Sequence, residues 1–242
     1  MDANTYEVLS FDCYGTLVDW ESGIISGLRP LLRSHGVEAT DDEILALHAQ
    51  TEHKLQTASE RDGYVKYRDV LGEEVREAGR EWGFEPSPSE VEALPNSVRY
   101  WLPFPDTVNA LRALKGRYRL AIISNIDDGL FALTARYLEV EFDYIVTAEQ
   151  AGTYKPSLNN FELALDRIGV APEKLLHVAE SLFHDHVPAK EMGLDTAWIH
   201  RRAAKVDFGA TPPAEAEPDL EVPDLESLVH ALGLRGSEGD RY

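Results

Sequence analysis

Cysteine, positive charge and long apolar segments are all scarce in this chain of 242 residues. The single cysteine, Cys13, excludes an intramolecular disulfide and any cysteine-rich metal site, which is typical of a reducing compartment. No apolar run approaches the ~18 residues that a membrane-spanning helix needs. Residues 1–4 are polar and acidic, unlike the start of a signal peptide. We therefore expect a cytoplasmic protein without a membrane partner.

The charge balance narrows the possible partners further. The chain has 43 Asp and Glu residues against 23 Lys and Arg, a formal net charge of −20. Such a field repels phosphate backbones, so we expect no nucleic-acid partner. It also opposes the approach of a small anionic substrate unless the binding site carries local positive charge.

Apolar patterning predicts strands that alternate with helices over most of the chain. The predicted strands are 6–12, 118–123, 142–147, 175–179 and 195–200, and the helices are 106–115, 129–137, 158–168, 188–192 and 225–232. Repeated strand–helix units indicate an α/β fold with a doubly wound, mostly parallel, Rossmann-like sheet. The Pro-, Ala- and Glu-rich segment 209–223 predicts a surface loop.

The region from about residue 19 to residue 94 has a different pattern. Its apolar residues recur at three- and four-residue spacing without strand-like alternation, which predicts helices over 23–33, 41–59 and 64–82. This block therefore reads as a helical insertion after the first strand. We predict a core domain of residues 1–17 and 96–242, and a helical cap domain of residues 18–95.

Polar residues follow the predicted strands at their carboxyl ends. They are Asp12, Tyr14, Ser124, Asn125, Lys155, Glu180 and Asp185. In an open α/β sheet, ligands bind beyond the carboxyl ends of the strands. We therefore expect these residues to converge on one crevice, with the helical insertion above it.

Four short motifs occupy these positions in order. Phe11-Asp12-Cys13-Tyr14-Gly15-Thr16-Leu17, Ser124-Asn125, Lys155-Pro156 and Glu180-Ser181 followed by Asp185 resemble the ordered motifs of the haloacid dehalogenase superfamily of hydrolases. The resemblance covers nearly the whole chain, including an inserted helical cap. It implies that the Asp12 carboxylate attacks the substrate and forms an ester or acyl phosphate, which water then cleaves. The alternative is that Asp12 only caps the following turn.

The resemblance gives roles to the other motif residues as well. Thr16 would hold the Asp12 carboxylate, and Ser124 and Asn125 would donate hydrogen bonds to developing negative charge. Lys155 would neutralise Asp12 and the bound anion. The alternatives are a packing role for Thr16, helix capping by Ser124 or Asn125 and a solvated Lys155.

Two further features concern the walls of the crevice and a metal. Tyr14 and Trp20 are candidate substrate-binding residues, although Trp20 could instead pack between the cap and the core. In phosphatases of the superfamily, a set corresponding to Asp12, the backbone carbonyl of Tyr14, Glu180 and Asp185 would hold Mg²⁺. The alternative is that Asp185 only pairs with Lys155. His184 and His186 read as polar loop residues.

The residue two positions after the nucleophile separates two activities. Phosphatases of the superfamily carry a second Asp there to protonate the leaving alkoxide, and this chain has Tyr14. A halide leaves without a proton. The resemblance therefore favours hydrolytic dehalogenation of a small 2-haloacid without a cofactor, and a Mg²⁺-dependent small-molecule phosphatase is the alternative. A catalytically silent binding protein is a third reading.

The chain departs from the dehalogenase pattern at two places. Glu180 and Leu182 stand where dehalogenases usually carry small neutral residues, and Asp19-Trp20-Glu21 lacks an arginine that one subgroup carries. An arginine that binds the substrate carboxylate would then come from elsewhere in the insertion. The candidates are Arg29, Arg33, Arg61 and Arg68. The resemblance also implies a possible homodimer.

Overall fold

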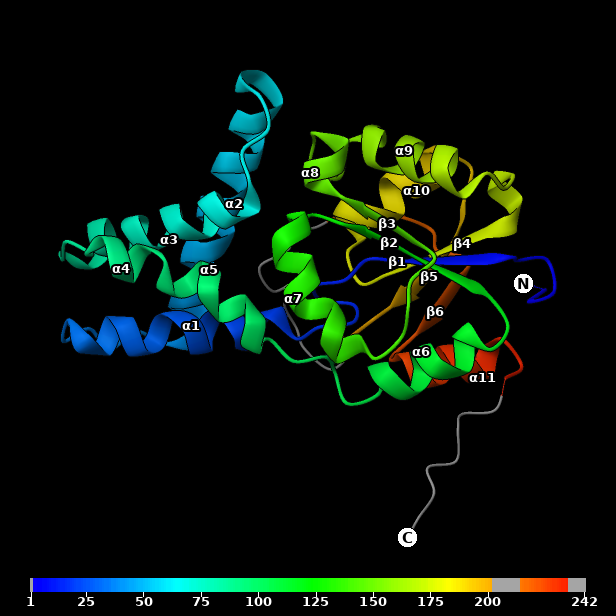
Figure 1. Cartoon of the computed structure of the whole chain (residues 1–242), viewed down its shortest axis with the longest axis horizontal. Coiled ribbons are helices and arrows are strands. Elements are labelled where there is room, and N and C mark those ends of the chain that lie inside the picture. The colour runs from blue at the N-terminus through cyan, green and yellow to red at the C-terminus, as the bar shows by residue number, and fades with distance from the viewer. Residues whose placement is uncertain (1, 202–213, 235–242) are drawn as a thin grey trace, which may run out of the picture.

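A computed structural model describes residues 2–201 and 214–234 of the chain, and its core is a parallel sheet (Figure 1). The six strands lie in the order β3-β2-β1-β4-β5-β6. Their bounds are β1 Val8–Phe11, β2 Arg119–Ser124, β3 Tyr144–Thr147, β4 Leu175–Ala179, β5 Asp195–Ile199 and β6 Leu220–Val222. Neighbouring strands pair in parallel throughout. The predicted doubly wound α/β fold is confirmed.

Strand β1 lies in the middle of the sheet and is buried along its whole length. Its sequence, VLSF, is apolar apart from Ser10, as expected for a parallel strand that is covered on both faces. The ladder continues one residue past the strand, because the Asp12 amide donates to the Val178 carbonyl at 3.1 Å. The central strand therefore delivers Asp12 to the carboxyl edge of the sheet.

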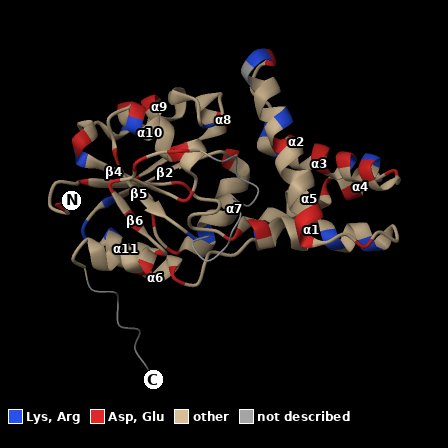
Figure 2. Cartoon of the chain, turned by 180° about the vertical axis from the view of Figure 1, so that it is seen from behind, with Lys and Arg blue, Asp and Glu red and all other residues tan. Residues whose placement is uncertain are grey.

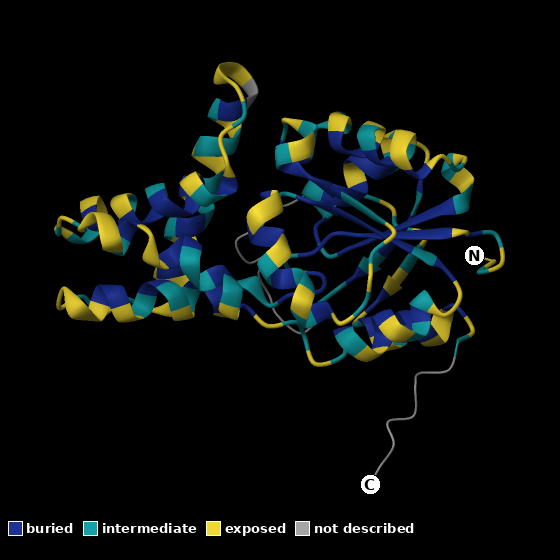
Figure 3. Ribbon diagram, viewed as in Figure 1, coloured by how far each residue is buried: buried dark blue, intermediate teal, exposed yellow. Residues whose placement is uncertain are grey.

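Helices cover both faces of the sheet (Figure 3). They are α6 Thr107–Lys115, α7 Asp128–Leu138, α8 Ala148–Ala151, α9 Leu158–Ile168, α10 Val187–Glu191 and α11 Leu225–Ala231. On one face α6 packs against α11, and on the other α9 packs against α10 (Figure 1). The apolar residues Phe161, Ala164 and Ile168 of α9 recur at three- and four-residue spacing and are buried.

The helical insertion, defined here as α1–α5, follows β1 and lies beside the carboxyl edge of the sheet (Figure 1). Its helices are α1 Trp20–Ser34, α2 Asp41–Asp62, α3 Tyr67–Trp82, α4 Pro88–Val91 and α5 Ala93–Ser97. A 3₁₀ turn, η1 Val98–Tyr100, leads back to the sheet. Asp19 caps α1, and a capping box of Thr40 and Glu43 starts α2. The domain boundaries at 17/18 and 95/96 stay a prediction.

One part of the sequence-based description was wrong. The segment 209–223 was expected to be a loop, but it contains β6, which pairs with β5 at the edge of the sheet. The strand has three residues, too few to show a strand-like sequence pattern. It is defined by its hydrogen bonds to β5. Residues 209–213 lie outside the described part of the chain. No helix of the described residues is long and apolar enough to span a membrane.

The acidic residues are spread over the helices, with basic residues among them (Figure 2). Several basic side chains on the insertion bind carboxylates on the same surface. Arg29 pairs with Asp41, Arg68 with Glu92, and Arg80 with Glu73 and Glu77. Exposed pairs of this kind contribute ~0–1 kcal/mol each to stability. The insertion is therefore held together chiefly by its apolar core rather than by these pairs.

The burial of β1 generates a stability prediction. Leu9 is fully buried in the central strand, so Leu9→Ala should lower the free energy of unfolding by about 2–5 kcal/mol, through lost burial and a cavity. Leu102→Ala is the matched control, because Leu102 is 59% exposed and should change stability by no more than about 0.5 kcal/mol. Urea denaturation measures both. Equal effects of the two substitutions would contradict the assignment of β1 to the core.

Candidate active site

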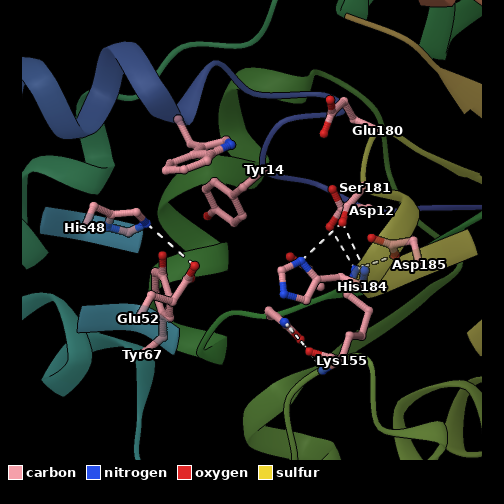
Figure 4. A pocket seen from close by; sticks show the side chains of 13 residues that line it. Asp12, Tyr14, His48, Glu52, Tyr67, Lys155, Glu180, Ser181, His184 and Asp185 are labelled. Atoms are coloured by element: carbon pink, nitrogen blue, oxygen red, sulfur yellow. Dashed lines mark hydrogen bonds and ion pairs between the residues drawn. The ribbon is translucent and has the colours of Figure 1, made fainter. Parts of the chain in front are cut away.

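The Asp12 carboxylate lies at the bottom of a cavity between the sheet edge and the helical insertion (Figure 4). The residue is 7% exposed, so the carboxylate is almost completely removed from solvent. Lys155 Nζ donates to Oδ1 at 2.9 Å, and Thr16 Oγ1 donates to Oδ2 at 2.8 Å. Each carboxylate oxygen therefore has a defined partner, and the group is fixed in orientation rather than free to rotate.

Lys155 is the centre of the site. Its side chain is 1% exposed, and Nζ donates to Asp12 Oδ1, to Asp185 Oδ1 at 2.6 Å and to the Ile123 carbonyl at 2.9 Å. These three bonds use all three protons of an ammonium. Burial alone would lower the pKa of Lys155, but the two carboxylates outweigh it and raise that pKa. Lys155 is therefore a buried, permanently charged residue.

Asp185 is held from the opposite side by the sheet. His177 Nε2, on β4, lies 2.9 Å from Asp185 Oδ1, and His177 Nδ1 lies 2.9 Å from Ser10 Oγ on β1. Burial would raise the pKa of Asp185, but Lys155 and His177 outweigh it and hold that pKa well below its ordinary value. Asp185 therefore remains ionised and anchors Lys155.

The pKa of Asp12 moves in the opposite direction. Burial raises it, and the negative charge of Asp185 raises it further, while the Lys155 ammonium and the Thr16 hydroxyl act against the rise. One ammonium between two carboxylates leaves one negative charge uncompensated. Since Asp185 stays ionised, Asp12 is the group of the three that takes up a proton first.

Thr16 ties the loop after β1 to the end of β4. Its hydroxyl donates to Asp12 and accepts from the Glu180 amide at 2.9 Å. Its carbonyl accepts from the Arg201 guanidinium, which also binds both carboxylate oxygens of Asp106. The packing role considered for Thr16 is thus accompanied by direct contact with the candidate nucleophile.

Ser124 and Asn125 follow β2 but differ in what they do. Asn125 Oδ1 accepts from the Lys155 amide at 2.6 Å, and Nδ2 donates to the Lys155 carbonyl at 3.0 Å, so this side chain holds the lysine loop. Ser124 is 1% exposed, and its Oγ has no hydrogen-bond partner among the described residues. A buried hydroxyl without a partner is costly, and in a cavity wall it is available to a ligand.

The cavity encloses about 570 Å³ of non-protein space, including solvent at its mouth. It is lined by Asp12, Tyr14, Trp20, His48, Glu52, Tyr67, Ser124, Asn125, Lys155, Glu180, Ser181, His184 and Asp185. The lining therefore includes every predicted site residue except Thr16, whose hydroxyl binds Asp12. Trp20 is both a wall and a packing residue, because its ring contacts His48 in a tilted arrangement with centroids 4.9 Å apart.

Tyr14 lines the cavity where a phosphatase of the superfamily would have its acid. Its hydroxyl lies 2.7 Å from Thr134 Oγ1, and its ring meets Trp101 edge to face. Burial raises the pKa of Tyr14 well above its ordinary value. The phenol therefore stays protonated.

The wall formed by α2 and α3 contains residues that were not predicted from the sequence to belong to the site. His48 Nδ1 lies 2.8 Å from Glu74 Oε2, and both side chains are 1% exposed. Glu52 lies 3.7 Å from His48 Nε2, and burial together with the Glu52 carboxylate raises the pKa of Tyr67. Figure 4 places His48, Glu52 and Tyr67 opposite Asp12 across the cavity. No sequence motif includes these residues. The one signal in the sequence was the i, i+4 spacing of His48 and Glu52 on α2.

His48 is the second positive charge in the lining. Burial alone would lower its pKa, but the carboxylates of Glu74 and Glu52 outweigh it and raise that pKa to about 9. None of the arginines that were candidates to bind a substrate anion lines the cavity; they are Arg29, Arg33, Arg61 and Arg68. The local positive charge that the sequence required therefore comes from Lys155 and His48.

The polar-loop interpretation of the two histidines near Asp185 was wrong. His184 lines the cavity, with Nδ1 3.2 Å from Ser181 Oγ, and burial lowers its pKa. His186 is fully buried, and its Nε2 lies 3.0 Å from the Ala179 carbonyl. The inward orientation of both side chains follows from a π-helical turn over residues 182–186.

The candidate magnesium ligands do not fit a metal centre. Asp12 Oδ1 and Asp185 Oδ1 both accept from Lys155 Nζ, so an ammonium lies between the two carboxylates. Within residues 2–201 and 214–234, no three His, Cys, Asp or Glu side chains come together as metal ligands would. The alternative in which Asp185 pairs with Lys155 describes the observed geometry.

The buried His48–Glu74 pair predicts how stability depends on pH. The pKa of His48 rises from 6.5 to about 9 on folding, so its contribution is complete below pH 6.5 and is lost as pH rises towards 9. We expect the free energy of unfolding to fall over this window, measured by urea denaturation.

The matched control is the double variant His48→Gln with Glu74→Gln, which keeps a polar pair but does not titrate. Its stability should fall less between pH 6.5 and pH 9 than that of the wild type. Parallel pH profiles for the two proteins would show that His48 is not charged in the folded state. His48→Leu alone should cost about 3–5 kcal/mol, because Glu74 would then be a buried, unpaired charge.

Known proteins resemble this chain over most of its length. The family model for haloacid dehalogenase-like hydrolases matches residues 6–193. The haloacetate dehalogenase H-2 of Moraxella sp. (strain B) is 26% identical, with 94% of this chain and 98% of that protein covered. The (S)-2-haloacid dehalogenase of Pseudomonas sp. (strain YL) is 27% identical, with 96% and 97% covered.

A solved structure shows the same arrangement. The L-2-haloacid dehalogenase PA0810 superposes with a TM-score of 0.79 at 25% identity, with 94% of this chain and 99% of that chain covered. The family match spans β1, the helical insertion and the strands up to β4, and so includes Asp12, Lys155 and Asp185. On this evidence the chain is a member of the haloacid dehalogenase-like hydrolases.

Proposed function

We propose that this hydrolase removes the halogen from small 2-haloacids through an ester on Asp12, without a metal. The observation that carries the proposal is the buried Asp12 carboxylate, which Lys155 and Thr16 orient in a cavity, with Tyr14 at the position where a phosphatase of the superfamily carries a second Asp. Dehalogenases that match the chain over nearly its whole length support it.

In the first step an Asp12 oxygen attacks C2 of the substrate from the side opposite the halogen. The new C–O bond forms as the carbon–halogen bond breaks, and the halide leaves with the bonding electron pair. No proton is needed, which accords with Tyr14 in place of an acid. The Ser124 hydroxyl is available to donate to the negatively charged substrate, and Lys155 and His48 are the positively charged side chains nearest to it, each paired with carboxylates of the protein.

In the second step water attacks the carbonyl carbon of the Asp12 ester. The ester C–O bond breaks, the 2-hydroxy acid leaves, and the water oxygen stays in the regenerated carboxylate. One proton is released for each halide. Lys155 and Thr16 stabilise the tetrahedral intermediate, because their donors already face both Asp12 oxygens.

The cysteine content of the chain bears on the cellular compartment in which this reaction takes place. A single buried Cys13 favours the cytoplasm as its compartment. Burial raises the pKa of Cys13 well above its usual value, so the thiol is not a competing nucleophile.

Replacement of the nucleophile tests the proposal. The wild type should release chloride from (S)-2-chloropropionate in EDTA, and Asp12→Asn should lose at least about 10³-fold of this activity, since a neutral amide is a poor nucleophile. Ion chromatography measures chloride, and mass spectrometry of acid-quenched enzyme should show the ester on Asp12.

Asp62→Asn is the control, because Asp62 is an exposed residue at the end of α2. It should keep full activity. Turnover by Asp12→Asn at the wild-type rate, or chloride release that EDTA abolishes, would overturn the proposal. Metal-dependent hydrolysis of p-nitrophenyl phosphate would instead establish the phosphatase alternative.

The raised pKa of Asp12 predicts the acid side of the pH profile. The nucleophile must be ionised, so kcat/KM should fall as pH decreases through a midpoint above the ordinary Asp value of ~3.9. Lys155→Met should move any residual activity to a still higher midpoint, because the ammonium lowers the pKa of Asp12. Initial rates measured after brief pH jumps separate titration from unfolding. A wild-type midpoint below 3.9 would contradict the assignment.

A further inference from the structure

A second cavity adjoins the one that contains Asp12. It encloses about 490 Å³ of non-protein space, including solvent at its mouth. It is lined by Ala49, Glu52, His53, Gln56, Thr57, Tyr154, Lys155, Pro156, Phe183 and His184. Glu52, Lys155 and His184 line both cavities, so these side chains form the boundary between the two. A 2-haloacid with a two- or three-carbon chain needs only the first cavity and would leave the second one empty.

The wall on the insertion side comes from one face of α2. Ala49, Glu52, His53 and Gln56 recur at three- and four-residue spacing, so they lie in one stripe along the helix. Gln56 Nε2 is buried and has no hydrogen-bond partner in the described part of the chain. A buried amide donor without an acceptor is costly unless a ligand supplies one. This position is suited to a carbonyl or hydroxyl oxygen.

Glu52 supplies the complementary group at the junction of the cavities. Its carboxylate lies 3.7 Å from His48 Nε2, on the α2 side of the cavity (Figure 4). An ionised carboxylate only accepts hydrogen bonds, so it selects a donor and repels a second anion. Ala49, Pro156 and Phe183 provide apolar surface between these polar groups.

We infer that the second cavity is a subsite for the substituent on C2 of the substrate, and that it selects a neutral group that both accepts and donates hydrogen bonds. A carboxamide on a short methylene chain has this chemistry: its carbonyl accepts from Gln56 and its NH₂ donates to Glu52. The inference rests on the proposed dehalogenation. It implies that the preferred substrates are 2-haloacids with longer, uncharged polar chains.

Three (S)-2-chloro acids of matched chain length test the inference. 2-Chloroglutaramate carries a carboxamide, 2-chloro-5-methylhexanoate an isosteric hydrocarbon and 2-chloroglutarate a carboxylate. We expect kcat/KM to be about tenfold higher for the amide than for the hydrocarbon, which leaves both polar groups unpaired. The carboxylate should be the poorest of the three, because Glu52 repels it. Equal values for all three would overturn the inference.

Substitutions within the subsite should change this order. Gln56→Leu, of similar volume, should lower the ratio of kcat/KM for the amide over the hydrocarbon about tenfold. Glu52→Gln should raise kcat/KM for 2-chloroglutarate relative to the amide. Lys54→Gln is the control, because Lys54 is an exposed residue of the same helix that pairs with Glu77, and it should leave both ratios unchanged. Unchanged ratios in Gln56→Leu and Glu52→Gln would refute the subsite.

The same series separates two kinds of failure. (S)-2-Chloropropionate needs only the first cavity, so chloride release from it tests the proposed function alone. If this substrate turns over and the longer acids show no preference, the subsite is wrong and the function stands. If no chloro acid releases chloride at all, the proposed function itself is wrong.

Discussion

The site depends on one buried ammonium. Lys155 Nζ binds Asp12, Asp185 and a backbone carbonyl at once, so three segments that are distant in sequence are fixed to one atom. Two ionised carboxylates could not be buried side by side without such a cation, because the cost of removing charge from water is too large. The two carboxylates together exceed the charge of the ammonium, and both Asp12 and Asp185 line the cavity. The same interaction that stabilises the site thus leaves its nucleophile incompletely neutralised.

The sheet explains why these residues meet. Strands β1, β2 and β4 are neighbours and run in parallel, so Asp12, Ser124 and the turn that carries Asp185 reach the same edge. Parallel order therefore allowed this convergence to be predicted from strand ends alone. The fold class, β4 and the three long helices of the insertion were also predictable, β4 from a run of mostly apolar residues and the helices from apolar residues at three- and four-residue spacing.

What could not be predicted depends on contacts between elements. His48 and Glu74 lie on different helices, and nothing in either helix indicates that the two charges pair. Asn125 lines the cavity as expected, but its amide also holds the backbone of Lys155, which only the loop conformation reveals. The edge strand β6 was missed for the same reason, since its hydrogen bonds come from β5. Periodicity reports which face of an element is buried, and it does not report which partner covers that face.

The two walls of the cavity therefore have different physical roles. The sheet side is rigid, because Asp12, Lys155 and Asp185 are joined by hydrogen bonds to one another and to strands. The insertion side keeps buried polar atoms without hydrogen-bond partners among the described residues, namely His48 Nε2, which lies 3.7 Å from Glu52, and Gln56 Nε2. Unpaired buried groups contribute nothing to the stability of the free protein, so their cost is offset only when a substrate binds. Groups of this kind discriminate strongly between ligands that pair with them and ligands that do not. The chemistry is thus set by the sheet, and the choice of substrate by α2.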